Sequence, residues 1–312
     1  MQHIALHAKR YYQFSEYLKE RFGCKVYKVT IDAGFTCPNR DGKLGWGGCT
    51  YCNNKGFSAN TRKAPGPIAE QVRQGMEFMR RRYKAEKFIA YFQAYTNTYA
   101  PIEILRAYYD EALAFEDMVA LSVGTRPDCV PESVLDLIES YRSSHEVWIE
   151  YGLQTIHDKT LRLINRGHDY AVFLDALDRT KQRDIKICVH VILGLPGESR
   201  DDMMATACAV GEMNIHSLKI HLMHVLKDTP IEKDYREGLF KALEFDEYIK
   251  LVCDFLECIP PTVSIQRLTA DGPRTILLAP AWATEKGRTL AAIDAEFIRR
   301  NSRQGIRTGS SH

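Results

Sequence analysis

Apolar and polar positions alternate along most of the chain in the manner of repeated strand–helix units. Six runs are rich in β-branched residues and almost continuously apolar, as are strands that are buried on both faces. These predicted strands span residues 25–31, 87–92, 118–123, 146–153, 185–193 and 216–225. Between them, apolar residues recur three and four positions apart, which predicts helices. The predicted helices span residues 67–83, 102–115, 131–143, 158–164, 171–183 and 201–213.

This alternation predicts the α/β fold class. Helical crossovers of this length join parallel strands in right-handed βαβ units. Six units are fewer than the eight of a complete barrel, so we expect a partial (β/α)6 TIM-like barrel. We place the barrel core at residues 25–230, between an N-terminal helical extension at residues 1–24 and a C-terminal α/β extension at residues 231–312. The extension includes a short predicted strand at residues 262–268.

Composition narrows the class of protein without identifying its partners. Apolar residues make up 45% and charged residues 26% of the chain, as in an ordinary folded domain. The N-terminus lacks the apolar core of a signal peptide, and no run approaches the ~18 apolar residues of a membrane span. We therefore expect a cytoplasmic protein without a membrane partner. In that reducing compartment, nine cysteines do not indicate a disulfide framework.

Positive charge gathers in two places, although the formal net charge is only +2. Residues 281–312 carry six basic and three acidic residues, and Arg80, Arg81 and Arg82 are consecutive in a predicted helix. Each group is either a solvated helix surface or a set of phosphate contacts.

The most informative stretch is "CPNRDGKLGWGGCTYC", which follows the first predicted strand. In parallel α/β folds, chemistry gathers at the carboxyl ends of strands. A structural zinc site and a [4Fe–4S] cluster each take four protein ligands. The loop offers only three, namely Cys37, Cys49 and Cys52. Cys24 or His190 could complete a zinc site, whereas a cluster with three thiolates leaves one iron open to a small molecule. An incidental glycine-rich surface loop is the third alternative.

The clasp Cys49-Thr50-Tyr51-Cys52 resembles the cluster motif of radical S-adenosylmethionine (SAM) enzymes. The commoner spacing in that family has three residues between the first two cysteines, and here there are eleven. The long gap is similar to that of the branch containing the catalytic subunit of the Elongator complex. The resemblance implies a [4Fe–4S] cluster bound by Cys37, Cys49 and Cys52, with SAM on the fourth iron and Tyr51 against the adenine.

Two later strand ends extend this resemblance. "IEYGLQTIHDKTLRLINRGH" is similar to the equivalent Elongator segment, which implies that Gln154 and Arg166 face the methionine and ribose of SAM. "VHVILGLPGE" resembles the fifth-strand motif that flanks the adenine. It implies cofactor-binding roles for His190 and for Gly194, where a missing Cβ allows close approach.

Two other strand ends depart from the pattern. "SVGTRPDCV" has Gly124 where the branch usually has an acid for the ribose hydroxyls. Arg126 and Asp128 remain candidates for substrate or SAM contacts and, with His190, are the catalytic candidates; no catalytic role is assigned. "YFQAYTNTY" replaces the usual glycine-rich segment for the SAM amino group. Gln93 is the cofactor candidate there, since backbone carbonyls can still serve while side chains shape the substrate pocket.

The resemblance implies reductive cleavage of SAM and hydrogen abstraction from a substrate. A small bacterial subgroup, similar over nearly the whole chain, implies trimming of a carboxymethylaminomethyl group to aminomethyl on the wobble uridine of tRNA. The expected partners are then tRNA and an electron donor such as flavodoxin or ferredoxin, with no DNA. A radical SAM enzyme acting on a small molecule or protein is one alternative. A zinc-stabilised nucleic-acid-binding protein without radical chemistry is the other.

Overall fold

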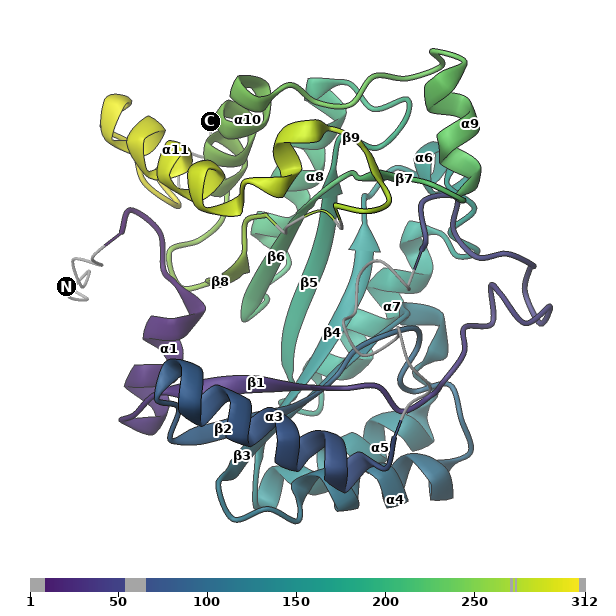
Figure 1. Cartoon of the computed structure of the whole chain (residues 1–312), viewed down its shortest axis with the longest axis vertical. Coiled ribbons are helices and arrows are strands. Elements are labelled where there is room, and N and C mark those ends of the chain that lie inside the picture. Colours follow the sequence, from purple (N-terminus) through teal and green to yellow (C-terminus); the bar gives the residue numbers. More distant parts are fainter. Residues whose placement is uncertain (1–8, 54–65, 270–271, 273, 309–312) are drawn as a thin grey trace.

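The computed structural model describes residues 9–53, 66–269, 272 and 274–308. Its central feature is a curled, parallel seven-stranded sheet with helices on its outer side (Figure 1). Residues 1–8 of the predicted N-terminal extension lie outside the described part. None of the helices within that part combines the length and apolar character needed to cross a bilayer.

The strands lie in sequence order across the sheet, and every neighbouring pair is parallel. They are β1 (Val26–Ile31), β2 (Lys87–Phe92), β3 (Met118–Thr125), β4 (Glu146–Gln154), β5 (Lys186–Leu193), β6 (Ser217–Leu222) and β8 (Ser264–Arg267). A small antiparallel sheet consists of β7 (Val225–Leu226) and β9 (Leu277–Ala279).

The helices are α1 (Phe14–Phe22), α3 (Ile68–Tyr83), α4 (Ile102–Leu113), α5 (Glu132–Ser140), α6 (Asp158–Leu163), α7 (Tyr170–Lys181), α8 (Arg200–Glu212), α9 (Pro230–Arg236), α10 (Phe245–Glu257) and α11 (Lys286–Arg299). Short 3₁₀ turns are η2 (Pro127–Cys129), η3 (Tyr141–Ser143) and η4 (Ala281–Thr284).

The prediction of a partial parallel barrel is confirmed, with two differences in detail. The strand predicted at residues 216–225 ends at Leu222, and the chain then turns away to pair β7 with β9. The strand predicted at 262–268 joins the main sheet as β8, parallel to β6. It does so because α10, whose second half is buried on almost every side, is the crossover of a further βα unit. The boundary at residue 230 stays a prediction.

The amino-terminal end of the barrel is closed by an apolar layer. Phe14 and Leu18 of α1 pack against Ile89, Trp148 and Cys188 on the concave face of the sheet. The rings of Phe14 and Trp148 meet edge to face, with centroids 5.4 Å apart. The chain before α1 also bridges to β8, and a second cavity of about 810 Å³ lies between the two sheet edges, lined by residues of α1, β1 and β8.

Above this layer, every strand of the sheet contributes at least one polar side chain to the interior. Strand register and side-chain contacts bring these residues together. They form the interior polar layer: Lys28, Tyr91, Ser122, Glu150, His190, Lys219 and Arg267.

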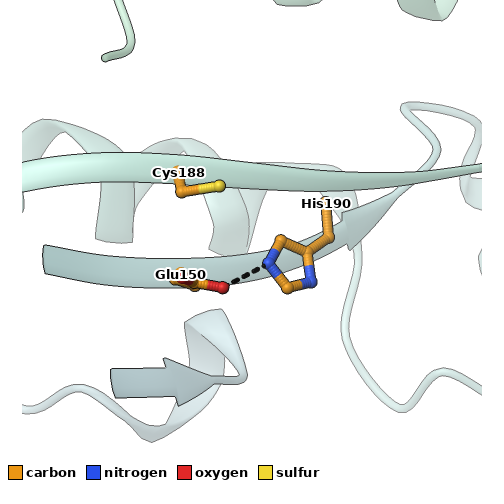
Figure 2. A group of neighbouring side chains, drawn as sticks. All are labelled: Glu150, Cys188 and His190. Atoms are coloured by element: carbon orange, nitrogen blue, oxygen red, sulfur yellow. Dashed lines mark hydrogen bonds and ion pairs between the residues drawn. The ribbon is translucent and has the colours of Figure 1, made fainter. Parts of the chain in front are cut away.

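Glu150 holds this layer together from the central strand β4. The ammonium groups of Lys28 and Lys219 pair with its Oε1 and Oε2 atoms respectively. Ser122 Oγ donates to Oε1 over 2.8 Å, and His190 Nε2–H donates to Oε2 over 2.8 Å. Figure 2 shows the imidazole turned from β5 toward the carboxylate. All the carboxylate's strong acceptor positions are therefore engaged.

The charge state of Glu150 follows from these contacts. Burial alone would raise the pKa of Glu150, but Lys219 and Lys28 hold it well below its ordinary value of 4.5. The carboxylate is therefore ionised in the fully buried interior and links β1 at one edge of the sheet to β6 near the other.

We predict that Glu150→Gln lowers the unfolding free energy by about 3–5 kcal/mol at neutral pH, because two buried ammonium groups lose their anion. The folded-state pKa is depressed, so this stabilisation is present above pH 4.5 and is lost as pH falls further. Thermal midpoints of both proteins measure the difference. Glu285→Gln, which removes an exposed ion pair with Arg288, is the control and should cost at most about 1 kcal/mol. Equal losses in the two variants would contradict this role.

Candidate active site

A cavity of about 470 Å³ opens among the carboxyl-terminal halves of the strands. It is bounded by the cysteine loop (residues 37–52) and by residues of β2 to β6 and β8 or directly after them. The predicted site residues that line it are Tyr51, Gln93, Arg126, Gln154, Arg166, His190 and the three cysteines, Cys37, Cys49 and Cys52. Residues far apart in sequence thus meet where the strand-end argument placed them.

The cysteine loop is held in a defined position. Asp41 and Trp46 form an antiparallel bridge, so the long gap between the first two cysteines folds into a small hairpin. At the clasp, the N–H of Thr50 donates to the carbonyl of Ile164 over 3.0 Å, and the Thr50 carbonyl accepts from Ile231 N–H over 3.1 Å. The clasp is therefore fixed between the end of α6 and the start of α9.

Nitrogen donors point at two of the three cysteine sulfurs. Asn39 Nδ2 lies 3.8 Å and Arg166 Nη1 lies 3.7 Å from Cys49 Sγ. Arg40 Nη1 lies 3.5 Å from Cys52 Sγ. Such donors stabilise negative charge on metal-bound thiolates. Asn39 and Arg40 belong to the cysteine loop itself, and the sequence pattern did not single them out.

The cysteine environment fits a metal cluster better than free thiols. Burial, then the neighbouring Cys49, raises the pKa of Cys52 to about 11, although Arg40 opposes the shift. A coordinating metal would remove the protons that burial favours.

Arg166 connects the cysteines to the end of β4. Its Nη2 donates to the carbonyl of Gly152 over 2.7 Å, while its buried Nε has no hydrogen-bond partner among the described residues. A Cβ at Gly152 would lie 2.8 Å from Nη2 and 2.7 Å from Gln154 Nε2, so a larger residue there would displace both side-chain ends. Gln154 has φ +76° at a register shift of the strand, and Gly167 follows Arg166 at φ +78°. Helix α6 itself ends at Leu163 with Ile164 as its C-cap, and Asn165 at φ +51° is the left-handed residue that follows, so Gly167 lies beyond the cap.

Arg126 and Asp128 form a buried pair. Arg126 Nε and Nη2 each donate to the Asp128 carboxylate over 2.8 Å. Burial would raise the pKa of Asp128, but its bond to Arg126 lowers it. Arg126 lines the cavity and its buried Nη1 is unpartnered within the described chain; Asp128 does not line the cavity. Arg126 is therefore available to a ligand, while Asp128 positions it.

The segment after β2 adopts a backbone that normally requires glycine. Ala94 has φ +94° and Tyr95 has φ +61°, both in the region disfavoured for side-chain-bearing residues. Gln93, Ala94 and Tyr95 all line the cavity. Next to them, Asn97 Nδ2 donates to the carbonyl of Gly124 over 2.8 Å. This segment keeps the conformation of a glycine-rich one while presenting side chains, and such strain is typical of functional sites.

Gly194 is the predicted cofactor residue that lies outside the cavity lining. Its φ is +85°, and a Cβ there would approach Leu243 to 3.0 Å. Its N–H points at Met203 Sδ, 3.2 Å away. Packing accounts for this glycine, and its cofactor role stays a prediction.

The positive charge of the C-terminal segment is largely paired within the protein. Arg300 and Arg307 both bind Asp254 and Glu257 of α10. In the helix with three consecutive arginines, Arg80 pairs with Asp117 over 2.5 Å. Arg300 and Arg307 stabilise the packing of α10 against the chain end, so these two arginines do not form a free phosphate-binding arm.

Comparison with known proteins agrees with this geometry. The Radical SAM superfamily model matches residues 37–207, and the Radical_SAM C-terminal domain model matches residues 215–299. YtqA of Bacillus subtilis is 43% identical over 95% of this chain and 92% of its own length. A tRNA uridine(34) acetyltransferase of Methanocaldococcus infernus is 25% identical over 51% of this chain and 30% of its own.

A solved structure shares the fold. The archaeal M. infernus Elp3 with an N-terminal deletion superposes with a TM-score of 0.70 over 89% of this chain and 64% of that one, at 18% identity. These matches exclude the zinc-binding alternative without radical chemistry. The chain therefore belongs to the radical SAM superfamily, with similarity over about half of its length to Elongator complex protein 3 of Saccharomyces cerevisiae, and its cofactors are a [4Fe–4S] cluster and SAM.

Proposed function

We propose that this enzyme trims the carboxymethylaminomethyl group of the tRNA wobble uridine to aminomethyl. The carboxymethyl unit would leave as glyoxylate, with its aldehyde oxygen from water, and the two electrons released would be taken up by the conversion of SAM to methionine and 5′-deoxyadenosine. The observation that carries the radical chemistry is the meeting of three cysteines, with nitrogen donors on their sulfurs, and two partly unpaired arginines in one cavity. The tRNA substrate rests on the Elongator-like branch, in which the similar M. infernus protein is named for uridine 34 of tRNA.

Cys37, Cys49 and Cys52 would hold the cluster. When bound, the cluster and SAM supply one-electron cleavage to methionine and a hydrogen-abstracting 5′-deoxyadenosyl group. A flavodoxin or ferredoxin is the proposed source of the electron.

The chain's own residues would bind and orient SAM and line the cavity around it. Arg166 Nε and Arg126 Nη1 are buried donors that suit the carboxylate and hydroxyls of SAM. Burial, then the neighbouring Cys49, raises the pKa of Tyr51 well above its usual value. Its side chain therefore stays un-ionised where it lines the cavity beside the cysteines.

The exposed face of the cysteine-loop hairpin suits unpaired nucleotides. Trp46 is 78% exposed at the hairpin, and Lys43 lies 5.2 Å from the ring centroid of Tyr99. Arg40 and Gly48 of the same loop line the cavity. Exposed aromatic rings beside cations stack on the bases of single-stranded loops. An anticodon loop that rests here would have its wobble base beside the cavity.

The cluster assignment predicts that Cys49→Ala loses nearly all bound iron and sulfide after anaerobic purification. Cys208→Ala is the control, because Cys208 is exposed on α8 and outside the cavity. It should keep both at the wild-type level. Equal iron content in the two variants would contradict the assignment.

The substrate assignment predicts that tRNA from cells lacking the gene accumulates the carboxymethylaminomethyl nucleoside and lacks aminomethyl products. Mass analysis of tRNA nucleosides, followed by conversion with purified enzyme, SAM and a reductant, tests this. An unchanged wobble-uridine profile would remove the tRNA assignment. If 5′-deoxyadenosine still formed, a small molecule or protein would become the substrate.

Stacking on Trp46 predicts that Trp46→Ala weakens binding of an anticodon stem–loop RNA by about fivefold to a hundredfold. Fluorescence anisotropy with unreduced enzyme measures binding without turnover. Phe78→Ala, which removes an aromatic side chain 49% exposed on the outer helix α3, should leave the affinity unchanged. Equal effects of both variants would exclude the hairpin as the RNA contact.

A further inference from the structure

The interior polar layer holds more positive charge than it can pair. Lys28, Lys219 and Arg267 are its basic residues, and Glu150 is its one carboxylate. Both oxygens of Glu150 are already engaged by the two lysines, Ser122 and His190. Arg267 is half-buried and lines the second cavity as well, so its unpaired charge is partly desolvated, and a further anion would stabilise this layer.

Arg267 carries the unpaired charge. Its backbone lies opposite that of Lys219 in the β6–β8 ladder, and its side chain lines the cavity. Within the described residues, its guanidinium has no ion pair and no side-chain hydrogen bond. Its planar group of donors is suited to a carboxylate, which it can bind through two parallel bonds.

Two histidines complete this end of the cavity. His190 and His221 lie with ring centroids 5.3 Å apart, and both line the cavity. Burial, then the charge of Lys219, lowers the pKa of His190 to about 4, so its Nε2–H remains bound to Glu150 in the neutral state. His221 Nε2 is buried without a hydrogen-bond partner in the described structure. An anion beside Arg267 would therefore find a second polar contact.

These features argue against a metal ion among Glu150, Cys188 and His190, although their ligand atoms lie within 4.8 Å of one another (Figure 2). The carboxylate is already paired with two ammonium groups, so a cation would add to the surplus positive charge. Burial, with Glu150 adding to its effect, also raises the pKa of Cys188 to about 12, which favours the neutral thiol.

We propose that Arg267, with His221 beside it, forms a subsite for a substrate carboxylate, held in place by the Glu150–Lys219 pair. The proposal rests on the proposed function: in a carboxymethylaminomethyl uridine, the group to be removed ends in a carboxylate, and the aminomethyl product has none. Arg267 would thus distinguish substrate from product and hold the arm inside the barrel. The methionine carboxylate of SAM is the other source of this chemistry, and the test separates the two.

The test compares two anticodon stem–loop RNAs that differ only at the wobble arm, one ending in a carboxylate and one in the uncharged carboxamide. Binding is measured on cluster-loaded enzyme with SAM and without reductant, so that no turnover occurs. Wild-type enzyme should prefer the carboxylate RNA by about tenfold to a hundredfold. Arg267→Gln should abolish the preference, and Arg267→Lys should restore part of it. Arg303→Gln removes an exposed arginine outside the cavity and should leave the preference for the carboxylate RNA unchanged.

SAM affinity, measured in the same variants, identifies the source of the carboxylate. It should be unchanged in Arg267→Gln. A loss of SAM affinity with an intact preference between the two RNAs would assign Arg267 to the cofactor and overturn the proposal. An intact preference with unchanged SAM affinity would overturn it equally.

A second probe separates this proposal from the tRNA assignment. N-methylglycine is the isolated arm, and at high concentration it should raise the thermal midpoint of wild-type enzyme but not of Arg267→Gln. If neither RNA binds but this difference persists, the carboxylate subsite stands and the tRNA assignment fails. If N-methylglycine shifts both proteins equally and the wild type shows no preference between the RNAs, the subsite is refuted.

Discussion

A single buried carboxylate determines how the interior of this half-barrel is arranged. Glu150 lies on the central strand and pairs with Lys28 from one sheet edge and Lys219 from β6. An ionised carboxylate in such a place is stable only when its acceptors are all used, and here they are. This pairing fixes the spacing of strands that no closed ring of hydrogen bonds holds. The strands that Glu150 spaces also line the cavity above it, so their spacing sets the shape of the cavity.

The cavity is divided by charge into two functional ends. At the cysteine loop, donors from Arg40 and Arg166 reach the sulfurs, which suits a cluster bearing thiolate charge. At β6 and β8, Arg267 lines the same space, and no anionic side chain of the described residues pairs with it. Radical chemistry needs its substrate fixed near the cofactor and shielded from water. An anchoring charge within the interior polar layer would fix a flexible arm far better than contacts at the rim.

The parts that could be predicted are those encoded locally. Cys37, Cys49 and Cys52 lie in a short loop, and their spacing points to cluster chemistry before any fold is known. Gln154 and Arg166 were found by resemblance, and the structure places both in the cavity. The interior polar layer was missed, although its signal was present: charged residues stand inside otherwise apolar strands, where burial makes them expensive unless they are paired.

By itself, the sequence determined the βα alternation, the parallel half-barrel and the position of the three cysteines, because strand period, helix period and loop spacing are local properties. Only the tertiary structure decided that β8 joins the sheet, that Asp128 positions Arg126 and that Arg267 has no ion pair among the residues that the structure describes. Those outcomes depend on which side chains meet across strands distant in sequence. Register and burial set such encounters, and both arise only once the sheet has closed around its core.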